Sequence, residues 1–285
     1  MFHLRTSAQT HYSRGLIIGA PNTGKTSFLS TIAEPTVVLA YPDEKGIRSI
    51  PVADHIQAYI FDSLPLVPEA TVQEHYAASL DKYHNVLAVT RTILAQKDKP
   101  EVLFLDGLSK FYDLILDVVT KGKYLQGRPF DETGDYTTRL YGNAHTLFRN
   151  YLSEIYLSAL PTIIATAWER LTYDDEASSD QQKRQDTRQG LRVWVPALPG
   201  QMGNLAAGEF DWCVRTGLTR GAECTQCQMI KKKGGKPLGD YHYTFQLQPW
   251  QHVQCVGIKG MKDHSIPTFI HQDWPMLRDF VARGA

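Results

Sequence analysis

The ten residues GAPNTGKTSF (19–28) carry the clearest chemical signal in this sequence. The pattern G-x-x-x-x-G-K-[ST] is filled at every fixed position, by Gly19, Gly24, Lys25 and Thr26. Glycines at this spacing let the backbone curl, so that successive N–H groups face phosphate oxygens, and a following helix adds its positive N-terminal end. Lys25 can then reach the β- and γ-phosphates, and the Thr26 hydroxyl can ligate Mg²⁺. These residues predict a site for ATP and its magnesium ion.

A phosphate-bound magnesium ion also needs a carboxylate at the end of a neighbouring buried strand. The apolar run VLFLD (102–106) supplies one, because it ends in Asp106. We expect Thr26 and Asp106 to hold Mg²⁺, with Asp106 acting directly or through a water molecule. The alternative is that Asp106 only caps the helix that follows it. The predicted contacts to the nucleotide come from Gly19, Asn22, Thr23, Gly24, Lys25, Thr26 and Ser27.

Hydrolysis further requires a group that positions the attacking water. In AYPDEKG (40–46), Asp43 and Glu44 follow the second apolar run, at the same edge of the expected sheet as the phosphate loop. Glu44 is the preferred acid because its side chain reaches further, although the sequence cannot separate it from Asp43. A solvated acidic turn is the alternative.

Another polar group at this edge comes from TIIATAWE (162–169), an apolar run that ends with Thr166, Trp168 and Glu169. A polar side chain at such a strand tip is placed to sense the γ-phosphate. An ordinary strand terminus explains the same residues equally well.

These side chains meet only if a sheet brings the ends of several strands to one edge. Short apolar runs predict strands at 15–20, 35–41, 55–62, 101–106 and 161–169. Helical spacing of apolar residues predicts helices at 25–34, 72–97, 108–119 and 146–160. Strand and helix alternate, which favours an α/β fold with a mainly parallel sheet flanked by helices.

The character of the chain changes near residue 172. The polar stretch 171–190 has no periodicity and is expected to form a mobile surface loop. Segments 191–198, 210–218, 241–249 and 252–260 are short and β-rich, which suggests C-terminal β-hairpins that extend the same sheet. Residues 273–285 are expected to form a helix with Asp273 as its N-cap and Pro275 near its first turn. We therefore expect one domain over 1–285, with a P-loop core in 14–170 and a β-rich extension in 191–285.

Composition limits the classes of function. The 285 residues are 42% hydrophobic, with 30 basic and 30 acidic side chains and a formal net charge of +0. This balance excludes a chain coated uniformly for nucleic-acid binding, but it allows a local basic groove. The sequence has no apolar run of about 18 residues and no signal-peptide pattern at its start. We therefore expect no membrane span and a cytoplasmic location.

Four cysteines leave two interpretations open. Cys224 and Cys227 form the one CxxC pair, whereas Cys213 and Cys255 stand apart. Reduced thiols in a β-rich region are the favoured interpretation. A four-cysteine zinc site is the alternative, although the usual second CxxC is missing.

Two basic clusters are candidates for contact with single-stranded nucleic acid, which favours cations with aromatic platforms. The first comprises Lys183, Arg184, Arg188 and Arg192, with Trp194 nearby. The second comprises Lys231, Lys232, Lys233 and Lys236, expected in a turn between strands, near Tyr241 and Tyr243. Solvated surface turns are the alternative for both clusters. Since neither matches a base-reading motif, any contacts should be mostly to the backbone.

The order of motifs GAPNTGKTS, VVLAYPDEKG, VLFLDGLSKF, TIIATAWE, PALPGQMGNLAAGEFDWCVRT and VGIKGMKD resembles the phage-encoded P-loop ATPases of the RecA-like group. Many of these are known as AAA-domain nucleotide-binding proteins, and some act as single-strand annealing proteins or minimal recombinases. The resemblance covers residues 14 to 280. The phosphate-loop motifs are generic, and the LPGQ…FD segment followed by GIKG is more specific.

This resemblance implies a RecA-like core that binds ATP and Mg²⁺, forms homo-oligomeric rings or filaments and acts on single-stranded DNA. It implies phosphate binding by Gly24, Lys25 and Thr26, metal support by Asp106 and a water-positioning role for Glu44. In RecA-like assemblies a basic residue near the C-terminal strands often reaches a neighbour's ATP, and Lys259 and Lys262 match that location.

Two other functions remain open, because P-loops also serve kinases and switches. A kinase of a nucleotide or small molecule would need an arginine-rich lid, for which KRQDTRQGLR (183–192) is a candidate. A non-enzymatic assembly switch would need only nucleotide binding that orders a partner surface.

Overall fold

The computed structural model describes residues 13–42, 49–61, 70–125, 135–173, 192–198, 209–220, 224–233, 241–248, 256–258 and 267–284. Its strands are β1 (Ser13–Gly19), β2 (Thr36–Ala40), β3 (Ile56–Ile60), β4 (Val102–Asp106), β5 (Thr162–Tyr173), β6 (Arg192–Pro196), β7 (Trp212–Arg220), β8 (Tyr241–Gln246), β9 (Gly257–Ile258) and β10 (Phe269–His271). Its helices are η1 (Ser27–Thr31), α1 (Val72–Ala95), α2 (Leu108–Leu125), α3 (Asp135–Leu157), α5 (Thr225–Lys232) and α6 (Trp274–Gly284).

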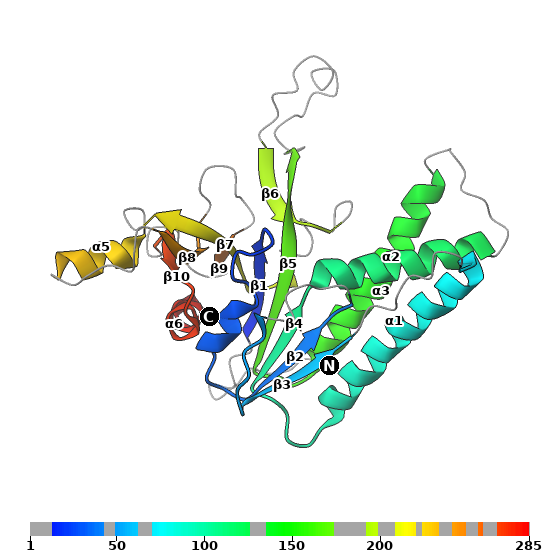
Figure 1. Ribbon diagram of the computed structural model, residues 1–285, viewed down its shortest axis with the longest axis horizontal. Coiled ribbons are helices and arrows are strands. Elements are labelled where there is room, and N and C mark those ends of the chain that lie inside the picture. The colour runs from blue at the N-terminus through cyan, green and yellow to red at the C-terminus, as the bar shows by residue number, and fades with distance from the viewer. Residues whose placement is uncertain are drawn as a thin grey trace, which may run out of the picture.

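The strands form one sheet in the order β10-β8-β7-β1-β5-β4-β2-β3, with β6 paired to β5 and β9 paired to β7 (Figure 1). Every pairing from β7 through β1, β5, β4 and β2 to β3 is parallel. The pairings of β6, β8, β9 and β10 are antiparallel. The expected α/β fold with a mainly parallel sheet flanked by helices is therefore confirmed.

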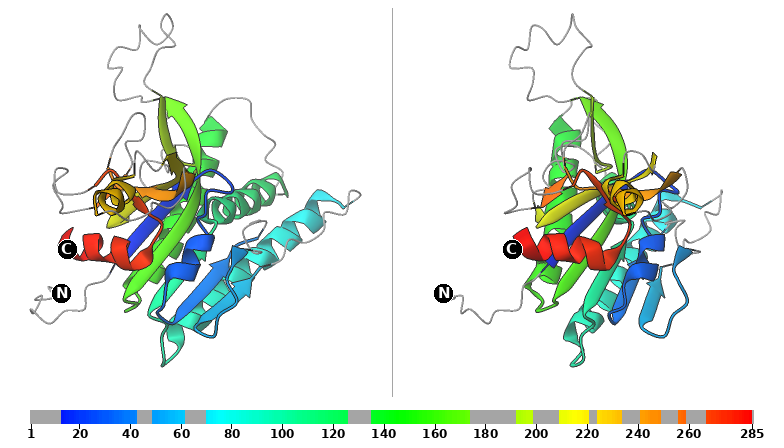
Figure 2. Two further views of the ribbon diagram at one scale, coloured as in Figure 1. Left: turned by 60° about the vertical axis from the view of Figure 1, so that its left-hand side comes forward. Right: turned by 90° about the vertical axis from the view of Figure 1, so that its left-hand side faces the viewer.

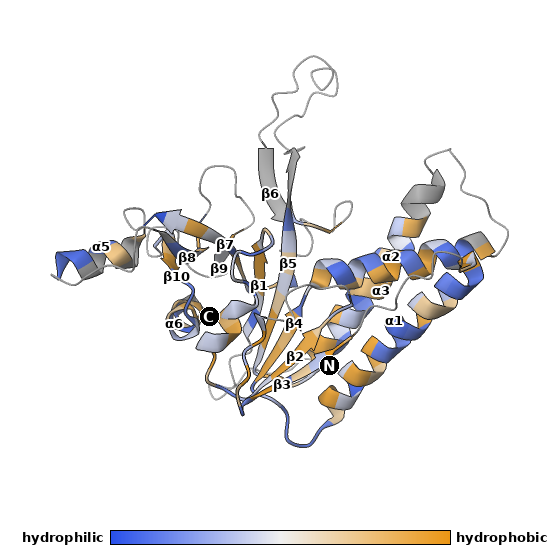
Figure 3. Ribbon diagram, in the orientation of Figure 1, coloured by the Kyte–Doolittle hydropathy of each residue, from blue (hydrophilic) through white to orange (hydrophobic). Residues whose placement is uncertain are grey.

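Both faces of the sheet are buried, which explains why its central strands are apolar without interruption. Successive residues of β1 point to opposite faces: Leu16 and Ile18 belong to one core cluster and Ile17 to the other. Helices α1, α2 and α3 cover the first face, and η1 and α6 cover the second (Figure 2). Figure 3 shows apolar residues along β2 and β4, and mixed polar and apolar residues on α1 and α2. Each fully buried aliphatic side chain contributes about 1.5–3 kcal/mol by leaving water.

The helix predicted for 25–34 is wrong in length and type, because only a five-residue 3-10 helix, η1, follows the phosphate loop. The Ser30 and Thr31 hydroxyls donate to the carbonyls of Ser27 and Phe28, and such local bonds compete with α-helical pairing. Pro35 also disfavours a helical backbone at the residue before it. The dipole of a long helix is therefore absent from this site.

Other elements differ from expectation in extent. Helix α3 begins at Asp135 rather than near residue 146, and β5 continues to Tyr173, where it pairs with β6. Helix α5 and strand β10 were not predicted. The terminal helix α6 is confirmed, because Asp273 Oδ1 accepts from the backbone N–H of Met276 at 2.9 Å. Most of the loop expected at 171–190 lies outside the described residues.

Strand β7 joins the sheet beside the strand that leads into the phosphate loop. Its register runs from Gly15 opposite Trp212 to Ile18 opposite Arg215, in parallel. The C-terminal part of the chain therefore supplies a direct neighbour of β1. Among the described residues, no helix is both long and apolar enough to cross a membrane.

Candidate nucleotide-binding site

The phosphate loop curls between β1 and η1 through two residues with left-handed backbone conformation. Asn22 has φ 63° and Gly24 has φ 85°. The positive φ favours glycine at position 24, where a Cβ would also lie 2.5 Å from Gln272 Oε1 and displace that side chain. A curl of this kind turns successive N–H groups toward one concave region, as phosphate binding requires.

Lys25 is almost fully buried, and its ammonium group lies inside the curl. Lys25 Nζ donates to the carbonyl oxygens of Gly19 at 2.8 Å and Ala20 at 2.7 Å. These bonds keep the charge at the base of the loop, next to the end of β1. A compact ammonium ion so held is suited to bind phosphate oxygens as a point charge.

Asp106 is held between two threonine hydroxyls at the carboxyl edge of the sheet. Thr26 Oγ1 donates to Asp106 Oδ2 at 2.9 Å, and Thr166 Oγ1 donates to Asp106 Oδ1 at 2.7 Å. Thr166 Oγ1 also accepts from the backbone N–H of Gly107 at 2.8 Å. These bonds direct the Asp106 carboxylate toward the phosphate loop, as metal support requires and a helix cap does not. All three side chains are buried.

Burial raises the pKa of the Asp106 carboxyl above its ordinary value. The hydrogen bonds from Thr166 and Thr26 and the positive charge of Lys25 oppose that rise. An anion in such a place gains from a nearby cation, because a metal ion offsets the cost of desolvation. The donor set of one hydroxyl and one carboxylate also suits the oxygen preference of Mg²⁺.

Thr166 reaches Asp106 because β5 lies between β1 and β4 in the sheet. Parallel register places Gly19 opposite Trp168 and Leu105 opposite Ala165. The predicted strand tip thus lies at the expected edge, although β5 itself continues beyond it. The polar side chain there, Thr166, is bonded to the Asp106 carboxylate.

Glu169, also on β5, forms a two-point ion pair with Arg215 of β7. The Arg215 Nε and Nη2 groups donate to the two Glu169 carboxylate oxygens at 2.6 Å and 3.0 Å. The Glu169 side chain is only 3% exposed. This pair bridges the two strands that flank β1.

Two residues that the sequence did not single out hold the phosphate loop from the C-terminal half. The Thr216 hydroxyl lies 2.6 Å from the Thr23 hydroxyl, and Gln272 Nε2 donates to the Thr23 carbonyl at 2.9 Å. Thr216 also approaches position 19 so closely that a Cβ there would lie 2.1 Å from the Thr216 hydroxyl oxygen. This contact requires glycine at position 19. No local pattern marks these contacts, since they join residues far apart in the chain.

The predicted water-positioning acid Glu44, its neighbour Asp43 and the basic residues Lys259 and Lys262 lie outside the described residues. The structure does describe the end of β2, the strand that precedes Glu44 in the chain. Ala40 pairs with Asp106, and the Tyr41 N–H donates to the Asp106 carbonyl at 3.1 Å. The chain therefore leaves the sheet toward Glu44 directly beside Asp106, and the role of Glu44 stays a prediction.

The second basic cluster is on a helix and not in a turn between strands as predicted. Lys231 and Lys232 lie in the last turn of α5, and Lys233 follows them, all three exposed. Basic residues are favoured there, because carbonyl groups at a helix C-terminus attract cations. Of the first cluster, Arg192 and the nearby Trp194 lie on β6, and Lys183, Arg184 and Arg188 lie outside the described residues, as does Lys236.

The cysteines do not form a four-cysteine group within the described part of the chain. Cys213 is buried on β7 in the sheet core, and Cys255 lies outside the described residues. Cys224 and Cys227 lie at the start of α5, which follows β7 and precedes β8 in the expected β-rich region. Both are buried, and their neighbours include two histidines.

Comparison with known proteins agrees with this geometry. Residues 11–236 match the family described as AAA domain, AAA_24. No curated protein matches the chain. The matched range includes the phosphate loop and the strands that carry Asp106 and Thr166. The match covers most of the sequence, and the chain therefore belongs to this AAA-type family of P-loop ATPases.

Proposed function

We propose that the protein is a magnesium-dependent ATPase of the RecA-like group that acts on single-stranded DNA in phage recombination, annealing or replication. The observation that carries the proposal is the contact of Thr26 and Thr166 with the two oxygens of Asp106, beside the buried Lys25. This arrangement brings a phosphate loop, the Asp106 carboxylate and a third polar group together at one edge of a parallel sheet. The protein would work as a homo-oligomeric ring or filament in the host cytoplasm.

The chain's own groups have distinct roles in this proposal. Thr26 would hold Mg²⁺ through its hydroxyl, and Asp106 would support the ion directly or through a water molecule. The ion, when bound, would neutralise charge on the β- and γ-phosphates. Lys25 would leave the loop carbonyls for the phosphate oxygens. Thr166 would keep the Asp106 carboxylate oriented, so that little reorganisation is needed when the nucleotide binds.

Glu44 would position the attacking water, because its segment leaves β2 beside Asp106. Lys259 would reach the ATP of a neighbouring subunit. Lys259 follows β9, which pairs with β7. A group supplied by a neighbour would make hydrolysis depend on assembly.

The proposed contact with single-stranded DNA rests on charge and exposure. Lys231, Lys232 and Lys233 are exposed together at the end of α5, and the Tyr243 side chain on β8 is 47% exposed. Cations on a surface that also exposes an aromatic ring suit sequence-independent binding, in which cations contact the backbone and bases stack on the ring.

A steady-state ATPase assay with and without single-stranded DNA, with particle size measured in parallel, tests the proposal. We expect Mg²⁺-dependent ATP turnover whose rate rises when single-stranded DNA is added and when the subunits assemble. Lys25→Ala should abolish productive ATP binding, whereas Glu44→Gln should bind ATP and lose turnover, since one well-placed catalytic group contributes several kcal/mol to the barrier. Lys97→Ala, at an exposed position after α1, is the matched control for Lys25→Ala.

Three results would contradict parts of this proposal. Transfer of label from γ-labelled ATP to a nucleoside monophosphate would indicate a kinase. Slow turnover that no nucleic acid accelerates, with one protein partner retained through purification, would indicate an assembly switch. Parental turnover in Glu44→Gln would remove Glu44 from the mechanism.

A further inference from the structure

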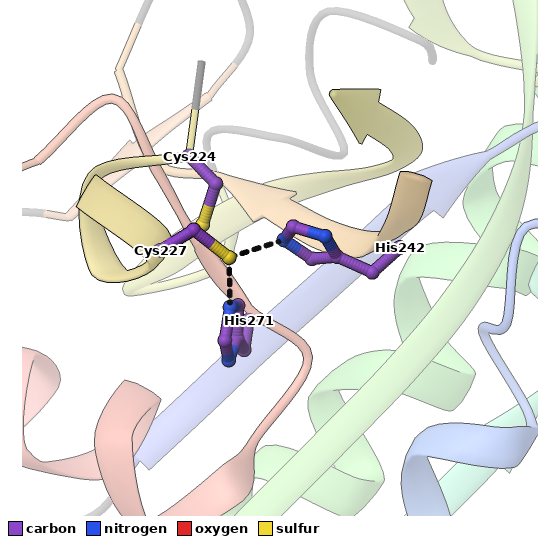
Figure 4. Close-up of side chains that lie close together, drawn as sticks. All are labelled: Cys224, Cys227, His242 and His271. Carbon is purple, nitrogen blue, oxygen red and sulfur yellow. Dashed lines mark hydrogen bonds between the residues drawn. The ribbon is translucent and has the colours of Figure 1, made fainter. Parts of the chain in front are cut away.

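Four side chains with metal-binding atoms converge at the edge of the sheet that is remote from β3. Cys224 immediately precedes α5, Cys227 lies in its first turn, His242 is on β8 and His271 is on β10. One ligand atom from each residue lies within 4.8 Å of every other (Figure 4). The two thiols are buried and the two histidines are half-buried.

The spacing of these atoms matches a tetrahedral metal site. Cys227 Sγ lies 3.3 Å from His271 Nε2 and 3.6 Å from His242 Nε2. In a tetrahedron with Zn–S of about 2.3 Å and Zn–N of about 2.0 Å, sulfur and nitrogen ligands lie about 3.5 Å apart. We propose that Cys224, Cys227, His242 and His271 bind a structural Zn²⁺ ion.

The chemistry of the four groups favours zinc over other cations. Two thiolates and two imidazoles are soft and borderline ligands, which suit Zn²⁺ and not Mg²⁺ or Ca²⁺. Two thiolates also neutralise the charge of the ion, so that a buried site carries no net charge. Four protein ligands fill a tetrahedral shell, which is typical of a structural site rather than a catalytic one.

The backbone of α5 brings the two cysteines together. Cys224 N donates to the Arg220 carbonyl at 3.2 Å, and the Cys224 carbonyl accepts from Gln228 N at 3.1 Å, so the helix begins at this residue. Cys224 is therefore the residue that caps α5 and Cys227 lies in its first turn, so both thiols lie at the N-terminus of this helix.

Zinc would join two short elements, α5 and β10, to β8, which pairs with β7 over six residues. Helix α5 has eight residues and β10 has three, and isolated helices of that length are unstable in water. Strand β10 pairs with β8 through only three registered residues. A metal bound by all three elements would fix the sheet edge, and metal binding would stabilise the folded chain directly.

A disulfide between Cys224 and Cys227 is the competing explanation. It accounts for the two neighbouring thiols but not for two imidazole nitrogens directed at the same point. His242 and His271 come from strands that meet only in the folded sheet, and their rings lie 4.7 Å apart. The histidines, rather than further cysteines, complete the set.

Metal analysis of the full-length protein, purified under reducing conditions without added zinc, tests the proposal. We expect one zinc ion per chain. Cys227→Ala and His271→Ala should lose it, whereas Cys213→Ala, which changes a buried cysteine outside the cluster, and His84→Ala, at an exposed histidine, should retain it. Zinc retained in Cys227→Ala, or no zinc in the parent protein, would overturn the proposal.

A second measurement on the parent protein keeps the test independent of whether the variants fold. After removal of zinc by a chelator, titration with Co²⁺ should give the intense visible bands of a tetrahedral site and a thiolate-to-cobalt charge-transfer band. X-ray absorption of the zinc form should show two sulfur and two nitrogen ligands. A six-coordinate cobalt spectrum, or a shell without sulfur, would contradict the assignment. Neither readout depends on ATP hydrolysis, so a failure here would leave the proposed ATPase function standing.

Discussion

Each oxygen of the Asp106 carboxylate accepts one hydrogen bond from a threonine hydroxyl. In the proposed mechanism the Thr26 hydroxyl binds the magnesium ion, whereas the Thr166 hydroxyl only orients Asp106. Thr166→Val keeps the shape of the side chain but leaves Asp106 Oδ1 and the Gly107 N–H without this partner. We expect the free energy of unfolding to fall by about 1–3 kcal/mol. Turnover should fall about tenfold or more, because each 1.4 kcal/mol of barrier is a factor of ten. Urea denaturation and ATPase titrations with Mg²⁺ measure both effects.

Thr166→Ser is the matched control for that substitution. It retains the hydroxyl, so the bonds to Asp106 and Gly107 can form, and its stability should stay within about 1 kcal/mol of the parent. If the serine variant loses as much turnover as the valine variant, the hydroxyl is not the group that matters. A purely structural role would lower stability without changing the Mg²⁺ dependence of turnover.

The raised pKa of Asp106 predicts that the ionised carboxylate, which the proposed activity needs, lowers the stability of the folded chain. The folded chain holds the Asp106 proton more tightly than the unfolded chain, whose pKa is about 3.9. This contribution to stability is present below the unfolded pKa and is lost as pH rises through the folded pKa. At pH 7, the ionised carboxylate therefore lowers the free energy of unfolding.

Asp106→Asn should then be at least as stable as the parent at pH 7, while its Mg²⁺-dependent turnover falls about a hundredfold. The stability gain should shrink as the pH falls toward about 4, where the parent carboxyl is protonated. Denaturation at several pH values, beside ATPase rates, checks both statements. A clear loss of stability at pH 7 would mean that hydrogen bonding outweighs desolvation at this residue.

At the scale of elements, the short strand β10 connects the sheet edge to the phosphate loop. Gln272 directly follows His271, and its amide donates to the Thr23 carbonyl. Gln272→Ala should weaken ATP binding about fivefold, since a net hydrogen bond contributes about 1 kcal/mol. Gln272→Glu should weaken it further, because it replaces the amide donor with a negative charge near the phosphates. Titration with a fluorescent ATP analogue measures the dissociation constants.

Zinc content is the internal control for the Gln272 variants, because Gln272 is not one of the proposed ligands. Both variants should retain zinc, so that any loss of ATP affinity arises at the loop. Unchanged affinity in both variants would show that Gln272 does not support the phosphate loop.

The sequence predicts those elements whose signal is local. The segments that form β1, β4 and β5 are apolar on both faces, and the phosphate loop has fixed spacing. These local patterns are enough to predict the parallel core of the sheet. Apolar spacing predicts an α-helix where the short 3-10 helix η1 is found. It does not reveal that the Ser30 and Thr31 hydroxyls bond to carbonyl groups of their own turn. The His242–His271 pair and the Gln272 contact depend on which strands become neighbours. Such long-range pairing is set by the whole sheet, and no short pattern contains it.

On the scale of the whole molecule, the phosphate loop and the cluster of two cysteines and two histidines lie on the same half of the sheet. Strand β7 pairs with β1, β8 and β10 follow it toward the sheet edge, and α5 projects from that side (Figure 1). Lys231 and Lys232 lie in the last turn of α5. A zinc ion at the start of α5 would therefore fix the direction in which these lysines are presented. Strand β10 contacts α5, and the adjacent Gln272 bonds to the phosphate loop, so β10 lies between the helix and the loop.

This arrangement predicts that the α5 lysines act by charge and by position. Lys231→Gln/Lys232→Gln should weaken single-stranded DNA binding and reduce the salt slope of log affinity by up to about two, since each lysine neutralises about one phosphate. ATP turnover without DNA should be unchanged, because neither residue contacts the phosphate loop. Lys97→Gln/Lys99→Gln removes the same charge at exposed positions after α1 and should leave the slope as in the parent. Fluorescence anisotropy of a labelled oligonucleotide at several salt concentrations makes the comparison, and equal slopes in both double variants would exclude α5 as the contact surface.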